Sequence, residues 1–175
     1  MADQQPSTHP NASRPHMPGY GLAEPTAGSG LLPWAWAVER LTAGHNYILA
    51  TTRPDGRPHA MPIWGVWVEN QFYFSTGAES RKARNLVSNP HCVISVEIAQ
   101  GSVIVEGQAL IIPPNDVPAQ AFDDYQTQYG WALDPQMGPI YVVRPQTVFG
   151  FSNVPGEFTG SATRWKFADN PEVKG

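Results

Sequence analysis

A series of short β-rich runs at close spacing is the feature that most constrains the fold of this chain. Six of them carry Val, Ile, Tyr, Phe and Thr in the patterns typical of strands, at residues 46–52, 59–68, 71–76, 91–99, 102–112 and 141–151. Asp55-Gly56 and Glu69-Asn70 lie between neighbouring runs and predict hairpin turns. Many antiparallel strands, with helices only as insertions, favour a mainly β fold that closes fully or partly into a barrel.

Two segments interrupt this pattern with helical features. Residues 33–44 begin with Pro33 in the first turn and reach Gly44 near the end, as the ends of many helices do. Residues 116–130 form the second long segment with helical character. We therefore expect two inserted helices here, besides a shorter one discussed below.

Composition divides the 175-residue chain into one domain and two tails. Residues 1–30 are rich in Pro, Ser, Gly and Ala, cannot bury enough surface to offset their ordering entropy, and are expected to form a disordered tail. The domain is expected over residues 31–168, and residues 169–175 form a short C-terminal tail. His9 and His16 are isolated histidines in the first tail, so no metal site is predicted. Removing residues 1–28 is expected to leave ligand affinity nearly unchanged.

Charge and cysteine content exclude several classes of protein. A net charge of −4 argues against general nucleic-acid binding, which needs a basic surface. Cys92 is the only cysteine, so one chain can form neither an internal disulfide nor a multi-cysteine metal site. Its neighbours favour a buried, inert thiol. Because the sequence has no apolar run of membrane-spanning length and no signal segment, a cytoplasmic protein without a membrane partner is expected.

The basic residues gather where a helix is expected to begin. Ser80 precedes the run RKARNLVSN and is a natural N-cap, while Pro90 marks the stop. Arg81 and Lys82 oppose the helix dipole at that end, and a bound phosphate would resolve the conflict. A solvated basic turn is the alternative. Further cations follow or precede at Arg53, Arg57 and Arg84.

The strand over residues 59–68 carries a proline and two tryptophans. Pro62 removes a ladder hydrogen bond, so we expect it at a sheet edge or a bulge, and a bulge would leave neighbouring backbone groups free for a ligand. Trp64 and Trp67 are three residues apart and face opposite sides of the strand. One is expected in the core, and the other could cover an aromatic ring or a dimer partner.

These residues resemble the pyridoxamine 5′-phosphate oxidase-like superfamily of split β-barrels. The resemblance covers about residues 31–167 and is strongest in TTRPDGRPHAMPIWGVW, FSTGAESRKARNL and TGSATRWKF. It implies an antiparallel split barrel that forms a homodimer, with flavin or deazaflavin sites shared between two subunits. The fold class implied is therefore a homodimeric split β-barrel.

The motifs of the family's oxidases align without a gap. Their Tyr-Thr and Ser-Arg-Lys motifs fall on Ser75-Thr76 and Ser80-Arg81-Lys82. Their R-x-x-x-L-K motif falls on residues 60–65, where Ala60 and Gly65 replace the basic residues, which implies a changed cofactor environment. The oxidases' C-terminal substrate signature is absent, so oxidation of pyridoxamine phosphate is not expected.

The pattern T-x-R-x-D-G-R-P, M-P-x-W and S-R-K-A-R-N-L is more similar to the actinobacterial flavin/deazaflavin oxidoreductases. Many of these use coenzyme F-420, whose phosphate and oligoglutamate tail require a positive groove. The resemblance implies that Arg164 and Trp165 reach a cofactor site across the dimer. The expected cofactor-binding residues are Arg53, Met61, Pro62, Ile63, Trp64, Ser75, Thr76, Ser80, Arg81, Lys82, Asn85, Arg164 and Trp165.

The resemblance implies an oxidoreductase that transfers hydride between coenzyme F-420 and a small electron-poor substrate. The cofactor carries this chemistry, so no catalytic residue is assigned, although His59 or Tyr125 could donate a proton. Three alternatives stay open: an FMN-dependent oxidoreductase, a non-enzymatic flavin- or deazaflavin-binding protein, and a haem-binding relative with ligands among His45, His59 and His91.

Overall fold

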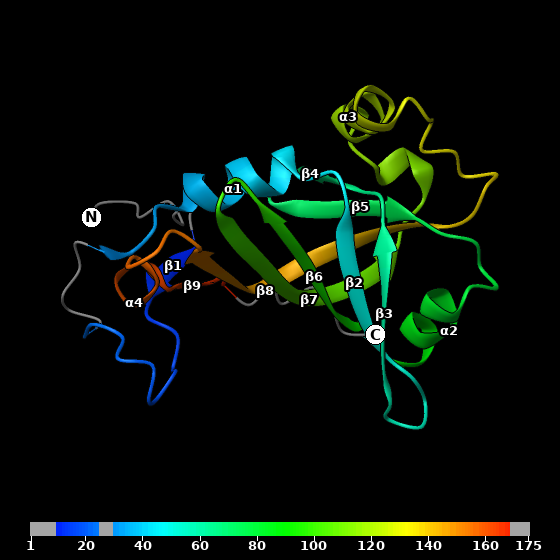
Figure 1. Cartoon of the computed structure of the whole chain (residues 1–175). Helices are drawn as coiled ribbons and strands as arrows, with labels where there is room; N and C mark the ends of the chain where they lie inside the picture. Colours follow the sequence, from blue (N-terminus) through cyan, green and yellow to red (C-terminus); the bar gives the residue numbers. More distant parts are fainter. Residues whose placement is uncertain (1–9, 25–29, 169–175) are drawn as a thin grey trace, which may run out of the picture.

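A computed structural model of the chain describes residues 10–24 and 30–168. Its elements follow the chain in a predominantly β order (Figure 1). They are β1 (Asn11–Ser13), α1 (Trp34–Ala43), β2 (Tyr47–Thr52), β3 (Pro58–Ile63), β4 (Val66–Val68), β5 (Gln71–Ser75), α2 (Arg81–Ser88), β6 (His91–Ile98), β7 (Gly101–Ile111), the 3-10 helix η2 (Pro114–Asp116), α3 (Ala119–Tyr129), β8 (Ile140–Ser152), α4 (Phe158–Ser161) and β9 (Thr163–Lys166).

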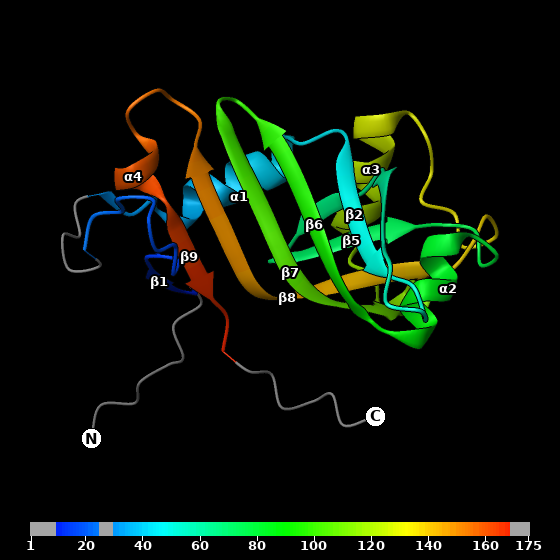
Figure 2. The same cartoon turned by 60° about the horizontal axis from the view of Figure 1, so that its bottom comes forward.

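The strands form one sheet in which every pairing is antiparallel. The order along the sheet is β1-β9-β8-β7-β6-β2-β3, and β5 joins it by pairing with β8 and carries β4. Figure 2 shows β2, β6, β7 and β8 side by side with α1 behind them. The prediction of a mainly antiparallel β fold with helical insertions is confirmed.

The long strand β8 divides the sheet into two parts. Its first residues, 140–143, pair with β5, and residues 147–150 pair with β9, while β7 lies along its other side. The register between β7 and β8 shifts next to Gly107, opposite Pro145. A Cβ on Gly107 would lie 2.3 Å from the Arg144 carbonyl oxygen, so the strands approach too closely there for any other residue. This irregularity bends β8, so that the residues before it pair with β5 and the residues after it pair with β9.

The buried side chains form two hydrophobic cores, and the larger one takes residues from both parts of the sheet. The larger core lies under α1 and includes Trp34, which makes edge-to-face contacts with Trp67 and Trp165. The smaller core joins β4, β5 and the start of β8 to α3 through Ala121 and Tyr125. Both cores meet at β8, whose inward residues belong alternately to one or the other.

The N-terminal segment differs from the expected tail. Asn11–Ser13 form β1 and pair with β9, and Arg14 is 5% exposed, with its guanidinium donating a 3.0 Å hydrogen bond to the Ala162 carbonyl. Composition predicted too little apolar surface for order, but this segment is held by backbone and guanidinium hydrogen bonds instead. The rest of the expected tails at residues 1–9, 25–29 and 169–175 lies outside the described residues.

Several local predictions agree with the structure. Glu69 and Asn70 both have positive φ angles, as a tight hairpin turn requires. Cys92 is buried, and burial raises the pKa of its thiol to about 12, which fits an inert core residue. β3 is an edge strand, so Pro62 lies at an edge, and its register with β2 contains no bulge.

Within residues 10–24 and 30–168, the helices are all too short or too polar to cross a membrane.

Removing residues 1–16 deletes β1 and Arg14, and we expect it to destabilise the fold. The loss of strand pairing and of buried guanidinium hydrogen bonds corresponds to about 2 kcal/mol, or a fall in Tm of roughly 4–8 °C, measured by calorimetry. The matched control lacks residues 1–9 only and keeps β1. Equal Tm values for the two truncated proteins would contradict a stabilising role for this segment.

Candidate functional site

A cavity of about 400 Å³ lies between the ends of β3 and β5, the start of α2, and α3. Six of the residues that line it were predicted as cofactor-binding residues, and a seventh, Tyr125, as a candidate proton donor. The lining residues are Asn46, Pro62, Ile63, Trp64, Ser75, Thr76, Lys82 and Tyr125. The structure therefore brings together residues that are up to 79 positions apart, as the difference between 125 and 46 shows.

One end of the cavity is the first turn of α2. The Ser80 hydroxyl accepts a 3.2 Å hydrogen bond from the Ala83 amide, which confirms Ser80 as the N-cap. Its oxygen also lies 3.2 Å from the Thr76 hydroxyl, so β5 and the helix start are tied together. Arg81 and Lys82 are the first two residues of α2, next to its unpaired amides. This end of the cavity suits an anion.

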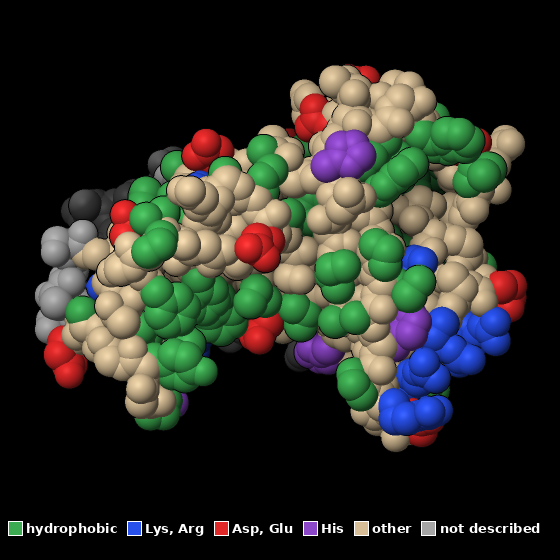
Figure 3. Space-filling view, in the orientation of Figure 1, with side chains coloured by type: hydrophobic (Ala, Val, Ile, Leu, Met, Phe, Trp, Pro, Cys, Tyr) green, Lys and Arg blue, Asp and Glu red, His purple; other side chains and the backbone are tan. Residues whose placement is uncertain are grey.

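Positive charge is concentrated around His59 on β3. Figure 3 shows the Lys and Arg side chains gathered at one end of the molecule, over the β2–β3 hairpin and α2. Desolvation, followed by the charges of Arg53, Lys82 and Arg81, lowers the pKa of the His59 imidazole below its ordinary value. The charges of one residue in the β2–β3 turn and of two residues at the start of α2 therefore act on the same imidazole.

The other two cations of the predicted groove have partners of their own. Arg57 forms an ion pair with Asp55 in the hairpin turn, in which Nε and Nη2 both donate to Oδ2, at 3.0 and 2.8 Å. Arg84 donates two hydrogen bonds to the Glu79 carbonyl, at 3.0 and 2.7 Å. Neither side chain lines the cavity. Fewer than the five predicted cations are thus available to form a positive groove for a ligand.

The opposite end of the cavity is apolar and flat. Pro62 and Ile63 end β3, and the Trp64 indole that follows is 44% exposed. Trp67 is 5% exposed and belongs to the larger core. The prediction that one tryptophan is core and the other is available to a ring is confirmed in its first half, and its second half stays a prediction. Met61 is 45% exposed on the edge strand and does not line the cavity.

Asn85 has a structural position that the motif did not reveal. It is fully buried and donates a 2.9 Å hydrogen bond to the Thr51 hydroxyl, which pins α2 to β2. Its side chain therefore has no surface for a ligand. The Thr51 hydroxyl also lies 3.4 Å from a His59 ring nitrogen, so Thr51 connects α2 to both strands of the β2–β3 pair.

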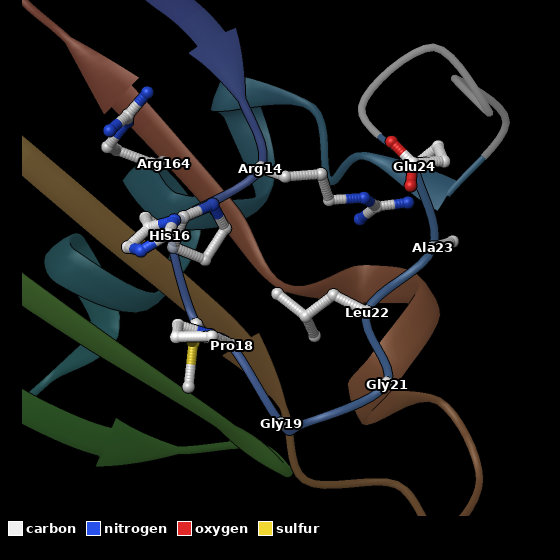
Figure 4. A pocket seen from close by; sticks show the side chains of 11 residues that line it. Arg14, His16, Pro18, Gly19, Gly21, Leu22, Ala23, Glu24 and Arg164 are labelled. Carbon is white, nitrogen blue, oxygen red and sulfur yellow. The ribbon is translucent and has the colours of Figure 1, made fainter.

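Arg164 and Trp165 lie on β9, away from the cavity. Trp165 is 1% exposed in the larger core, so packing, and not ligand contact, explains it. Arg164 donates hydrogen bonds to the Ser13 hydroxyl and lines a second cavity of about 470 Å³ next to the N-terminal segment (Figure 4). Arg14, His16 and Glu24 line the same cavity.

Sequence reasoning missed three residues at the site. Asn46 lines the cavity just before β2. Tyr129 stacks on Trp64 with ring centroids 4.8 Å apart and planes 11° apart. Gly138 accepts a 3.3 Å hydrogen bond from the Ser75 hydroxyl. The only available signal was the pair Tyr125 and Tyr129, which share one face of a predicted helix at a spacing of four.

Gly65, one of the departures from the oxidase motif, has a steric explanation. A Cβ at this position would lie 2.3 Å from Phe72 Cζ and 2.7 Å from the Tyr73 carbonyl oxygen. A basic side chain cannot occupy this position without moving β5. Close packing against β5 thus explains why a glycine stands where the oxidase motif has a basic residue.

The family model described as pyridoxamine 5′-phosphate oxidase matches residues 37–149, which carry the sheet and most of the cavity. The chain belongs to this family. Two curated relatives, the pyridoxine/pyridoxamine 5′-phosphate oxidases of two Porphyromonas gingivalis strains, are each 30% identical over 97 residues. That match covers 53% of this chain and 45% of each relative, so the chain spans about half the length of these family members.

Two solved structures of similar fold differ in how much they say about this chain. One is an F-420 reductase, 26% identical with a TM-score of 0.53, where the match covers 63% of this chain and 93% of the other. The second is a conserved hypothetical protein from Mycobacterium tuberculosis, 19% identical with a TM-score of 0.60, covering 73% of this chain and 89% of that one. The second supports the fold of this family member alone.

Replacing Lys82 with alanine should raise the pKa of His59, because one of the cations that disfavour the imidazolium is removed. Arg84→Ala is the matched control, since its guanidinium bonds the Glu79 carbonyl, and should leave this pKa unchanged. Titration of the assigned His59 ring signals by NMR measures both. An unchanged pKa in Lys82→Ala would show that the ammonium group does not face His59.

Proposed function

We propose that this protein is an oxidoreductase that binds the deazaflavin coenzyme F-420 in the cavity beside α2. The proposed reaction is hydride transfer to a small, electron-poor organic substrate. Membership of the pyridoxamine 5′-phosphate oxidase family supports a redox function in general. The similarity to an F-420 reductase at 26% identity supports this particular coenzyme.

The observation that carries the proposal is the union of two kinds of surface in one cavity. Lys82 and the capped start of α2 suit a phosphate, and the flat indole of Trp64 suits a ring system. Phosphate and a planar ring are the two recognition elements of flavins and deazaflavins alike. An ordinary solvated basic turn does not require an apolar slot beside it.

One buried donor near the cavity fits an anionic ligand as well. Arg53 Nε is buried and has no hydrogen-bond partner among the residues that the structure describes. The charges of Arg53, Arg81 and Lys82 all act on His59, and none of the three forms an ion pair with a carboxylate of the described residues. A phosphate or a tail carboxylate would compensate this charge.

In this proposal each residue holds or shields the coenzyme. Lys82, Arg81 and the α2 amides bind its phosphate, Arg53 contacts its acidic tail, and Pro62, Ile63 and Trp64 cover its ring. Ser75, Thr76 and Ser80 shape the turn between them. The bound coenzyme supplies the hydride chemistry, and the chain supplies orientation and exclusion of water.

Tyr125 is the better candidate for a proton donor. Its side chain is 6% exposed, lines the cavity, and desolvation raises the pKa of its hydroxyl. The hydroxyl therefore stays protonated near neutral pH and makes no hydrogen bond within the described part of the chain. His59, whose pKa is lowered, is neutral at that pH and does not line the cavity.

A homodimeric split barrel is part of the proposal. Ile48 is 42% exposed on β2, where it pairs with the cavity-lining Pro62, and Met61 is 45% exposed on the edge strand β3. Two large apolar side chains beside an open site favour cover by a second subunit. Arg164 of that subunit remains available to such a site, whereas Trp165 is buried in the core.

FMN is the alternative coenzyme, and a non-enzymatic carrier is the alternative role. The curated relatives that share this family are described as pyridoxine/pyridoxamine 5′-phosphate oxidases. A short anion-binding end, with Arg57 and Arg84 already engaged, suits a ligand that carries one phosphate and no long tail. Turnover with reduced coenzyme and a panel of acceptors separates an enzyme from a carrier.

Titration of the cofactor-free protein with F-420 and with FMN by calorimetry tests the proposal. We expect tighter binding of F-420, and a loss of about 10- to 100-fold in affinity for Lys82→Ala, because a charge-assisted phosphate contact is removed. Arg84→Ala is the control of equal charge change and should bind as the wild type does. Tighter binding of FMN would favour the alternative coenzyme, and binding of neither would refute the proposed site.

A further inference from the structure

The Trp64 indole has an unusual position for a large apolar side chain. It lies in the two-residue gap between β3, which ends at Ile63, and β4, which begins at Val66. One face stacks on Tyr129, and the side chain is still 44% exposed while lining the cavity. The indole is therefore supported on one face and open to a ligand.

Gly65 also lies in the gap between β3 and β4, so its backbone groups pair with none of the described strands. The Tyr129 hydroxyl takes the place of a strand partner. It accepts a hydrogen bond from the Gly65 amide at 3.1 Å and lies 2.9 Å from the Gly65 carbonyl oxygen. Buried backbone groups need such partners. A single side chain thus bonds both groups of the residue that follows Trp64.

The Tyr129 hydroxyl is itself held by α3 and the chain before β2. It accepts from Gln128 Nε2 at 3.0 Å and lies 3.0 Å from the His45 carbonyl oxygen. A hydroxyl has one hydrogen and two lone pairs, so two amides fill its acceptor sites and one carbonyl at a time takes its proton. Burial raises the pKa of Tyr129 to about 12, which keeps that proton in place at neutral pH.

The ring of Tyr129 is fixed as firmly as its hydroxyl. His45 packs on it edge-to-face with centroids 4.8 Å apart, and Tyr125 lies at the same centroid distance one turn earlier in α3. Gly130, with φ at +64°, ends the helix directly afterwards. The end of α3 is therefore joined to the β3–β4 gap at one well-defined point.

We propose that Tyr129 is a positioning residue that holds the Trp64 indole as a preorganised wall on which the planar ring of the bound ligand stacks. This inference rests on the proposed function of the cavity and assigns binding of the phosphate and of the ring to different residues. Lys82 and the start of α2 determine affinity for phosphate, and the pair Trp64 and Tyr129 determines affinity for the ring.

Ligands that carry only one of the two features separate these contributions. Riboflavin and 8-hydroxy-5-deazariboflavin have a ring without a phosphate, and inorganic phosphate has no ring. In Tyr129→Phe, which keeps the aromatic ring and loses the hydroxyl, we expect affinity for the ring ligands to fall by roughly 3- to 10-fold. Affinity for inorganic phosphate should not change. Lys82→Ala should show the reverse pattern.

A double-mutant cycle tests whether Tyr129 acts through Trp64. Trp64→Ala alone should weaken binding of the ring ligands by about 10-fold or more, as loss of a stacking partner does. Adding Tyr129→Phe to that variant should then have no further effect, whereas independent residues would give additive losses. Additive losses, or full ring affinity in Tyr129→Phe, would overturn the inference.

Two controls keep the outcomes distinguishable. Tyr73→Phe removes a hydroxyl whose one hydrogen-bond partner within residues 10–24 and 30–168 is Gln71, and it should leave ring binding unchanged. If Tyr129→Phe does not fold, the exposed Trp64→Ala variant still decides the inference, because unchanged ring binding there would exclude a stacking wall. Absence of ring binding by the wild type refutes the proposed function itself, and normal ring binding with an unaffected Tyr129→Phe refutes only the role of Tyr129.

Discussion

The site depends on the double pairing of β8. Its first residues pair with β5 and its later ones with β9. The change of direction coincides with the bulge beside the paired residues Gly107 and Pro145. That turn brings the end of β5, with Ser75, beside the end of β3 and under α3. Without its pairing to β8, β5 would be joined to β4 alone, and Ser75 would no longer be held in place beside the end of β3.

The anion-binding end and the apolar end are supported by different contacts. Asn85 and Thr51 fasten α2 to β2 from the inside, and the Ser80 cap fastens its first turn to Thr76. The apolar end is fastened from the outside, by the hydroxyl of Tyr129 on α3. Two ends that are each held by hydrogen bonds suit the proposed binding of a rigid ring and a phosphate, because a preorganised site loses less entropy on binding.

Sequence patterns predicted the helices, strands and turns better than the contacts between them. The turns at Glu69-Asn70, the Ser80 cap and the burial of Cys92 follow from local chemistry, which a sequence displays directly. Asn85 and Trp165 show where this fails, since a motif does not reveal which side of a helix or strand faces the core. Tyr129 was missed for the same reason, as its partners come from segments far away in the chain.

The N-terminal segment shows another limit of composition. Low hydrophobicity predicts little burial, yet backbone pairing with β9 and the Arg14 guanidinium need no apolar surface to order Asn11–Ser13. Such a segment extends the sheet by covering the free edge of β9. Order here depends on a complementary edge that the segment's own residues do not encode.

At the opposite border of the sheet, β3 begins with Pro58 and carries Pro62 near its end. Neither residue has an amide hydrogen to offer, so an incoming strand would find only part of a ladder along this border. Two copies of the chain are therefore discouraged from joining edge to edge into a continuous, growing sheet. Association through the exposed side chains of Ile48 and Met61 remains open to them, and contact of that kind can end with two subunits.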